Sequence, residues 1–180
     1  MKIEGCVALV TGSNRGLGKA LVAALLEAGA AKVYAAARDE KKLGFTDARV
    51  VPLTLDTTKP EQIAAAATQA RDVTLLVNNA GIMSAFDVLK ANPADIDADF
   101  RTNVLGTLGV IKAFVPVLER ANGAAIVKVL SVAVHAPIPS MGGYCASKAA
   151  AYSMTQALRP QLKAKRIGAT FHESDSDSIA

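Results

Sequence analysis

Short runs of apolar residues alternate along the chain with longer stretches in which apolar residues recur every three or four positions. The short runs are apolar throughout, which is typical of strands buried on both faces of a parallel sheet. The longer stretches have the period of amphipathic helices. The pattern predicts strands at 7–11, 32–37, 49–55, 124–131 and 167–172, a strand that runs into a turn at 73–81, and helices at 17–28, 60–70, 93–118 and 144–163.

This order of elements predicts an α/β fold, a doubly wound parallel sheet of the Rossmann type in three layers. In such sheets, ligands bind beyond the carboxyl ends of the strands. Pro52 has no N–H to give to a neighbouring strand, so we expect the third strand at an edge. Thr58 and Glu61 fit a capping box, with Pro60 in the first helical turn.

The composition indicates one domain. The chain has 180 residues, of which 51% are hydrophobic and 20% charged, and it has no Trp. We expect a single domain over 1–172, followed by a disordered acidic tail over 173–180, where the sequence ends ESDSDSIA. No apolar run approaches the roughly 18 residues of a membrane span, and the N-terminus lacks a signal-peptide pattern. We therefore expect a cytoplasmic protein with no membrane partner.

The distribution of charged residues, cysteines and histidines bears on whether the protein binds nucleic acid or a metal ion. The net charge is +4, but the lysines are scattered and no aromatic residues lie between them, which argues against nucleic-acid binding. Cys6, Cys145, His135 and His172 have no metal-site spacing, so no metal site is expected.

A glycine-rich segment joins the first predicted strand to the first predicted helix. Its glycines permit a tight turn and a close approach of the backbone to a pyrophosphate, and the helix N-terminus attracts phosphate. A plain strand-to-helix turn would explain the same glycines. The candidate cofactor-binding residues of this loop are Gly12, Ser13, Asn14, Arg15, Gly16, Leu17 and Gly18.

The residues after the second strand bear on which dinucleotide binds. Arg38 stands where an NAD site usually offers an acid, and Arg15 supplies a second cation nearby. Two guanidinium groups suit the 2′-phosphate of NADP, so NADP(H) is predicted in preference to NAD(H). The alternative is that Arg38 is only solvated and that Asp39 caps a short helix.

Tyr144 and Lys148 lie four residues apart on one face of a predicted helix. An ammonium about 4 Å from the phenol would stabilise phenolate by roughly 4 kcal/mol, so we expect a lowered pKa for Tyr144. Ser131, at the carboxyl end of the fifth strand, is placed to hold a reacting oxygen beside the phenol. The alternative is a surface stripe of amphipathic side chains.

Taken in order, TGSNRGLG, NNAG at 78–81, Asn103, Ser131 and YCASK resemble the short-chain dehydrogenase/reductase family over about residues 1–172. The resemblance implies a carbonyl or alcohol as small-molecule substrate, Tyr144 as acid/base, Lys148 as its partner and nicotinamide-ribose ligand, and Ser131 as oxygen holder. It also implies a relay role for Asn103. It adds the cofactor-binding candidates Asp56, Asn78, Ala80 and Gly81, and it places Tyr144 as well as Lys148 against the cofactor.

The sequence departs from the family pattern at one point, after the sixth strand. Family members usually continue from the sixth strand through a Pro-Gly turn to a substrate-covering segment and a seventh strand, and this sequence lacks that continuation. The open edge and the small-residue helix favour a homodimer or homotetramer. Two hypotheses follow: an NADP(H)-dependent short-chain oxidoreductase, or a truncated NADP-binding module that acts through oligomerisation without catalysis.

Overall fold

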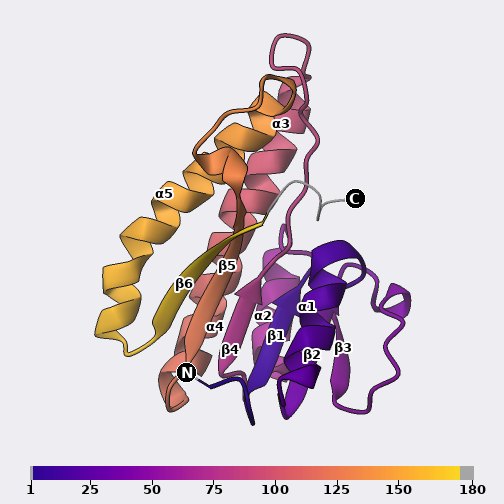
Figure 1. The fold of residues 1–180 in the computed structure, drawn as a ribbon, viewed down its shortest axis with the longest axis vertical. Coiled ribbons are helices and arrows are strands. Elements are labelled where there is room, and N and C mark those ends of the chain that lie inside the picture. Colours follow the sequence, from indigo (N-terminus) through magenta and orange to yellow (C-terminus); the bar gives the residue numbers. More distant parts are fainter. Residues whose placement is uncertain (1, 175–180) are drawn as a thin grey trace.

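A six-stranded parallel sheet forms the centre of the molecule (Figure 1). The computed structural model describes residues 2–174. The strand order is β3-β2-β1-β4-β5-β6, so the chain winds outward in two directions from β1. The strands are β1 (Val7–Thr11), β2 (Lys32–Ala37), β3 (Val50–Thr54), β4 (Leu75–Asn78), β5 (Ala125–Ser131) and β6 (Gly168–Ser174). This arrangement confirms the predicted doubly wound α/β fold.

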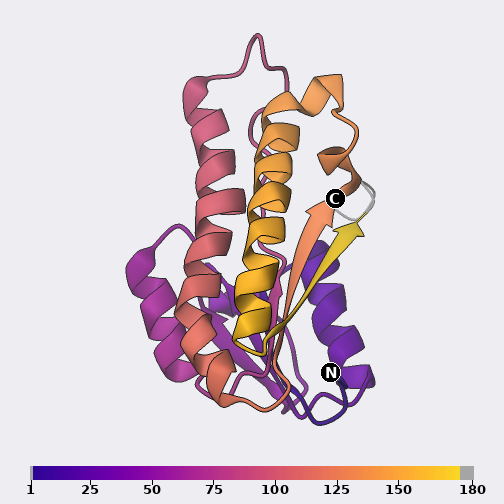
Figure 2. The ribbon, with the colours of Figure 1, turned by 90° about the vertical axis from the view of Figure 1, so that its left-hand side faces the viewer.

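Helices lie on both faces of the sheet, so the molecule has three layers (Figure 2). One face carries α1, and the other carries α2, α4 and α5, with α3 and α4 running on into one another. The helices are α1 (Gly16–Glu27), α2 (Pro60–Gln69), α3 (Pro93–Phe100), α4 (Thr107–Arg120) and α5 (Gly142–Ala164). A π-helical segment, Arg101–Gly106, joins α3 to α4.

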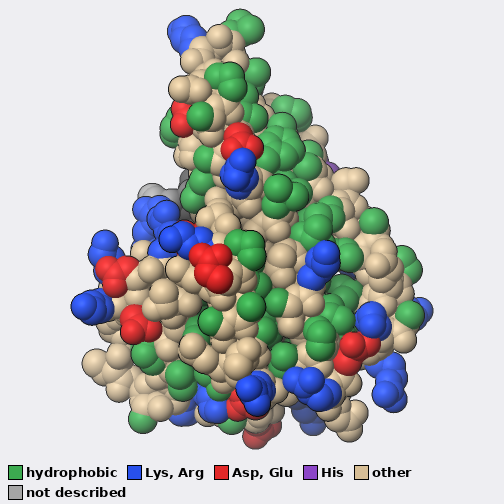
Figure 3. Space-filling view, turned by 180° about the vertical axis from the view of Figure 1, so that it is seen from behind, with side chains coloured by type: hydrophobic (Ala, Val, Ile, Leu, Met, Phe, Trp, Pro, Cys, Tyr) green, Lys and Arg blue, Asp and Glu red, His purple; other side chains and the backbone are tan. Residues whose placement is uncertain are grey.

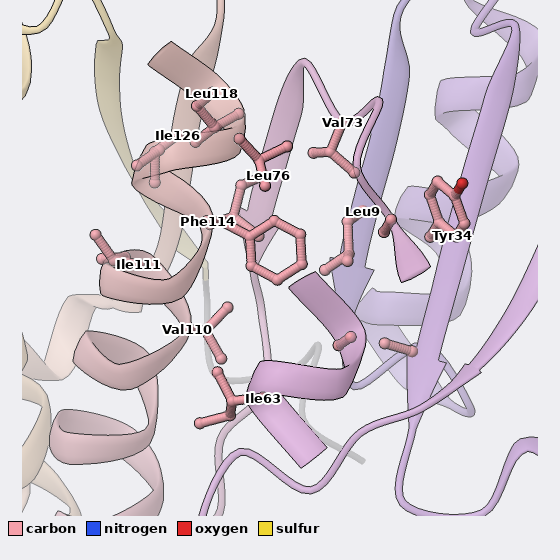
Figure 4. Packing of buried hydrophobic residues seen from close by; sticks show 14 of the residues in the cluster. Leu9, Tyr34, Ile63, Val73, Leu76, Val110, Ile111, Phe114, Leu118 and Ile126 are labelled. Carbon is pink, nitrogen blue, oxygen red and sulfur yellow. The ribbon is translucent and has the colours of Figure 1, made fainter. Parts of the chain in front are cut away.

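The larger apolar core lies between the sheet and the α2–α4–α5 layer. The Phe114 ring of α4 faces Leu76 and Leu9, which alternate with residues that face α1 (Figure 4). Phe114, Leu76 and Leu9 are fully buried. This core fixes the positions of the strands. A site at the carboxyl ends of the strands requires such fixed positions.

Pro52 lies in β3, which pairs with β2 alone and is therefore an edge strand, as predicted. The predicted capping box at Thr58 is wrong. The N-cap of α2 is Lys59, and no side chain among the described residues caps the helix. Thr58 instead donates from its backbone N–H and its hydroxyl to Asp56 Oδ1, at 2.9 and 2.7 Å. The Asp56 carboxylate accepts these hydrogen bonds in a local turn. This turn competes with the predicted cap, in which the Thr58 hydroxyl would accept from the first turn of α2.

The predicted boundary between the domain and its acidic tail, at residue 172, lies inside the sixth strand. The sixth strand continues to Ser174, pairing Leu130 with Glu173 and Ser131 with Ser174, so it extends two residues past the expected domain end. No seventh strand follows β6 within residues 2–174. Residues 175–180 of the expected tail lie outside the described residues.

The helical segment Pro93–Arg120 has the length and composition of a membrane span. About 44% of its most apolar window is buried inside the molecule. Phe114, Val110 and Val117 of this segment belong to the core beneath the sheet. A core helix of a soluble protein has the same properties, so the segment is weak evidence for a membrane.

Candidate active site

The glycine loop between β1 and α1 is built around backbone conformations that favour glycine. Gly12 has a φ of +71° and Gly16 a φ of +50°, both in the left-handed region. At Gly18, a Cβ atom would lie 2.0 Å from the carbonyl oxygen of Gly12. The loop therefore turns too tightly for a side chain at this point. Helix α1 begins directly behind it, and no side chain within residues 2–174 caps its N-terminus.

Polar side chains fix the loop against the turn that follows β4. Asn79 Nδ2 donates to the carbonyl oxygens of Thr11 and Gly12 at 3.0 and 3.2 Å. Thr11 Oγ1 accepts hydrogen bonds from the backbone N–H groups of Asn79 and Ala80 at 3.1 and 3.0 Å. The TG and NNAG motifs thus form one hydrogen-bonded unit across neighbouring strand ends.

A cleft of about 410 Å³ opens beyond the carboxyl ends of the strands. Most of the predicted cofactor-binding residues line it: Gly12, Asn14, Arg15, Gly16, Leu17, Gly18, Arg38, Asp56, Ala80, Gly81, Tyr144 and Lys148. The sequence did not single out several further lining residues, among them Thr57, Asn79, Ile82, Met83 and Thr102. Of these, the signal for Asn79 was present, because it is the second residue of NNAG.

Two predicted cofactor-binding residues do not line the cleft. Ser13 is fully buried, and its hydroxyl donates to the carbonyl oxygen of Val10 at 2.7 Å. Asn78 ends β4 and is 2% exposed, with its side chain turned into the protein. Successive strand residues point to opposite faces, so the turn presents Asn79 to the cleft instead of Asn78. Neither residue is among those that line the cleft, and their assignment as cofactor-binding residues stays a prediction.

Asn78 has an unusual neighbour. In the register of β4 with β5 it is paired with Lys128, which is 0% exposed. Neither Asn78 Nδ2 nor Lys128 Nζ has a hydrogen-bond partner within residues 2–174. Burial, together with the positive charge of Lys148, holds the pKa of Lys128 well below its usual range. A buried amine whose environment disfavours its charged form therefore lies inside the protein behind the cleft.

At the opposite end of the cleft, Arg38 follows β2 and Asp56 follows β3. Burial would raise the pKa of the Asp56 carboxyl, but the hydrogen bonds from Thr58 and the positive charge of Arg38 outweigh it and lower that pKa. Asp56 is thus a carboxylate at neutral pH. Arg15, at the N-cap of α1, adds a second guanidinium to the lining of this cleft.

Tyr144 and Lys148 lie on the first two turns of α5, and each is 4% exposed. Lys148 Nζ is 5.5 Å from the centroid of the Tyr144 ring. Burial raises the pKa of Tyr144, as do the charges of Cys145 and Asp99, and the hydrogen bond with Ser131 offsets this only in part. The predicted lowering of the Tyr144 pKa by Lys148 is therefore wrong. The ammonium lies over the ring, and burial dominates.

Burial acts on Lys148 too and lowers the pKa of its ammonium to about 8. Ser131 ends β5, is 2% exposed, and accepts a hydrogen bond from the N–H of Ala133 at 3.3 Å. The last residue of a central strand and the first turn of α5 thus bring a hydroxyl and a phenol together, with an amine on the same helix face.

Asn103 lies in the π-helical segment and is 0% exposed. Its Nδ2 donates to Ser147 Oγ on α5 at 2.9 Å and to the carbonyl oxygen of Ile82 at 2.9 Å. A Cβ atom on Gly81 would lie 3.1 Å from Asn103 Oδ1 and 3.6 Å from Lys148 Nζ. The amide and the amine therefore approach the same glycine, and π-helical turns of this kind are frequent at functional sites.

Asp99 is a structural residue that the sequence prediction missed. It is 0% exposed, and its carboxylate accepts hydrogen bonds from the N–H groups of Ser84 and Ala85 at 2.7 and 3.2 Å. It lies four residues before Asn103, and both residues bind the segment that follows NNAG. That i, i+4 spacing of two polar residues on an otherwise apolar face was the available signal.

The family model for short chain dehydrogenase matches residues 6–171, which contain all of these groups. This chain belongs to the short-chain dehydrogenase/reductase family. A short chain dehydrogenase from Burkholderia cenocepacia, solved in complex with NADP, is 46% identical with a TM-score of 0.93, covering 97% of this chain and 74% of that one. A family member from Burkholderia phymatum, solved in complex with NAD, is 30% identical with a TM-score of 0.87, covering 95% and 66%.

Curated relatives of this short-chain dehydrogenase/reductase are more distant. Estradiol 17-beta-dehydrogenase 11 of Mus musculus is 31% identical over 175 residues, which are 90% of this chain and 58% of the mouse protein. The 17-beta-hydroxysteroid dehydrogenase 13 of Homo sapiens is also 31% identical, with 57% of its length matched. The chain therefore spans just over half the length of these relatives.

Proposed function

We propose that this short-chain dehydrogenase/reductase is an NADP(H)-dependent oxidoreductase that interconverts a carbonyl compound and an alcohol. The proposal depends on one observation above all: Tyr144 and Lys148 line the cleft that the glycine loop borders, and Ser131, the last residue of β5, is hydrogen-bonded to Tyr144. A phenol, an amine and a hydroxyl so arranged form a proton donor and an oxygen-positioning group in one place.

The residues along the cleft fit a nicotinamide dinucleotide. Backbone N–H groups at the start of α1 suit a pyrophosphate, and the tight loop at Gly18 leaves its backbone open to it. Arg15 and Arg38 favour the 2′-phosphate of NADP over the 2′-hydroxyl of NAD. The Burkholderia cenocepacia relative with NADP supports this preference, whereas the Burkholderia phymatum relative holds NAD.

In carbonyl reduction, bound NADPH supplies the hydride that forms the new C–H bond. Tyr144 gives its phenolic proton to the carbonyl oxygen, which Ser131 holds beside it. The raised pKa of Tyr144 keeps the phenol protonated at neutral pH, as this direction requires. Asn103 fixes Ile82 and α5 around Lys148. The ammonium of Lys148 then returns a proton to the Tyr144 phenolate. Alcohol oxidation needs the phenolate, so we expect its rate to rise with pH.

The test of this function is Tyr144→Phe, which removes only the phenolic oxygen. We expect NADPH-dependent carbonyl reduction to fall about 10²–10⁴-fold, with NADPH affinity nearly unchanged. Tyr152→Phe is the matched control, because Tyr152 is two turns along the same helix with its ring against His135, and it should leave turnover unchanged. Retained activity in Tyr144→Phe would refute the mechanism. NADPH binding without turnover in the unmodified chain would select the alternative, a dinucleotide-binding module without catalysis.

We also propose that the protein is a cytoplasmic homodimer or homotetramer. Leu105, in the π-helical segment beside α5, is 61% exposed, and large exposed apolar residues are common at interfaces. Light scattering coupled to size-exclusion chromatography measures the assembly. Leu105→Glu should shift a dimer toward monomer, and an unchanged mass would remove this surface as the interface.

A further inference from the structure

Two chain segments surround the mouth of the site at Tyr144. They are residues 79–86, which follow β4, and residues 131–142, which run from β5 to α5. Neither segment contains Asp, Glu, Lys or Arg. The backbone joins them, because the N–H of Gly142 donates to the carbonyl oxygen of Phe86 at 3.1 Å. The substrate side of the site is thus a continuous wall without a carboxylate, ammonium or guanidinium of its own, and His135 is its titratable side chain.

The side chains of this wall are apolar and partly exposed. Met83, Ile138 and Met141 are partly buried and pack against the cluster that Ala133, Tyr144 and Cys145 form. Val132, directly after Ser131, is 39% exposed. Met83 also lines the cleft, so the apolar wall continues from the cofactor side to the reacting groups. Two flexible methionines can adapt their shape to a hydrocarbon surface.

Lys148 lies beside Tyr144, where the proposed mechanism already uses its ammonium, and the other charged groups near this wall are engaged or lie elsewhere. Asp87 and Lys90, just beyond the first segment, pair with each other at 3.5 Å. Asp99 is buried and binds the backbone of Ser84 and Ala85. Arg15 and Arg38 line the glycine-loop side of the cleft. Figure 3 shows hydrophobic side chains interspersed with basic and acidic ones at the protruding end of the molecule, where the connection from β4 to α3 lies.

We infer, on the basis of the proposed function, that the substrate is an uncharged carbonyl compound or alcohol whose hydrocarbon part lies against Met83, Ile138 and Met141. A carboxylate or phosphate on this part of the substrate would lose its hydration without gaining a charged partner. An apolar body would instead remove the exposed parts of these side chains from water. The site therefore selects against anionic substrates as well as in favour of apolar ones.

Matched ketones test the inference in the NADPH oxidation assay. Butan-2-one, hexan-2-one and octan-2-one differ only in chain length, while 5-oxohexanoate and 7-oxooctanoate match the two longer ketones but end in a carboxylate. We expect kcat/KM to rise about fourfold for each methylene that contacts the wall. The carboxylates should be at least about tenfold worse than their neutral partners. Equal or better turnover of the carboxylates would overturn the inference and leave the proposed function intact.

A lysine introduced into the apolar wall provides a second test of the inference. Ile138→Lys should reduce kcat/KM for octan-2-one and reduce or reverse the discrimination against 7-oxooctanoate, with NADPH affinity unchanged. Leu89→Lys is the matched control, because Leu89 is 97% exposed at the protruding end and outside the wall. An unchanged ratio of the two substrates in Ile138→Lys would overturn the inference. If neither the ketones nor the carboxylates are reduced by a chain that binds NADPH, both the proposed function and this inference fail.

Discussion

Asn103 and Ile82 are joined by two hydrogen bonds through one carboxamide. Asn103 Oδ1 accepts from the N–H of Ile82 at 2.9 Å, and Asn103 Nδ2 donates to the carbonyl oxygen of Ile82 at 2.9 Å. The same Nδ2 reaches Ser147 Oγ on α5 at 2.9 Å. One amide therefore fixes the loop after β4 to the helix that carries Tyr144 and Lys148.

Asn103→Ala should affect both stability and turnover. It removes the side-chain partner of the partly buried N–H and carbonyl of Ile82, so we expect the free energy of unfolding to fall by about 1–3 kcal/mol. The loop and α5 would lose their common anchor, and small displacements of reacting groups can reduce turnover by about 10²-fold. Denaturant unfolding and kcat measure the two effects. Asn103→Asp, which keeps the acceptor, is the comparison, and full activity in Asn103→Ala would contradict the positioning role.

The pKa of Lys148, at about 8, predicts a pH dependence of cofactor binding. Below that pH Lys148 is an ammonium that can donate to the nicotinamide ribose. Above it, the charge is lost, so we expect NADPH affinity to weaken as the pH rises through about 8. Fluorescence titration of NADPH from pH 6 to 10 measures this. Lys148→Arg stays charged throughout, so the weakening should disappear, and its persistence would assign it to another group.

Lys128→Met should stabilise the protein. The substitution replaces a buried amine that lacks a hydrogen-bond partner within residues 2–174 by an apolar side chain of similar length. Removing such an unsatisfied group gains about 1–3 kcal/mol, and each kcal/mol corresponds to about 2–4 °C in Tm for a domain of this size. Lys112→Met, at an exposed position of α4, is the control and should change Tm little. A lower Tm for Lys128→Met would show that the amine has a stabilising partner.

The lowered pKa of Lys128 also predicts how the free energy of unfolding changes with pH. The unfolded chain binds this proton up to the ordinary lysine pKa, whereas the folded chain has already lost it. Stability therefore rises with pH between the lowered pKa and that ordinary value. Lys128→Met should flatten this rise in unfolding free energy, leaving the smaller contribution of Lys148 in the same direction.

Arg38→Asp should change the dinucleotide preference. It removes a guanidinium from the cleft and places a carboxylate where a 2′-hydroxyl could donate to it. Losing a charge-assisted hydrogen bond costs about 1.5–3 kcal/mol, so NADPH affinity should fall about 10–100-fold while NADH affinity rises. Dissociation constants for both nucleotides measure the change. Arg71→Asp, an exposed arginine on another surface, controls for net charge, and an unchanged ratio in Arg38→Asp would refute the NADP preference.

The sequence by itself determined the elements and their order. Continuous apolar runs predicted buried parallel strands, and Pro52 predicted an edge because a missing N–H has the same consequence in any sheet. The i, i+4 spacing of Tyr144 and Lys148 fixed their common helix face. These features depend on bonds and periodicities within a few residues, and so they can be predicted from neighbours in the chain.

Only the tertiary structure decided the directions of the side chains and their pKa values. It turned Asn78 inward and Asn79 toward the cleft, and it let Asp56 take the hydrogen bonds of Thr58 in place of the predicted cap. It also raised the pKa of Tyr144, where spacing alone predicted the opposite. The physical reason is that burial and hydrogen-bond competition arise from groups that are distant in sequence, and desolvation is the largest influence on the pKa of Tyr144.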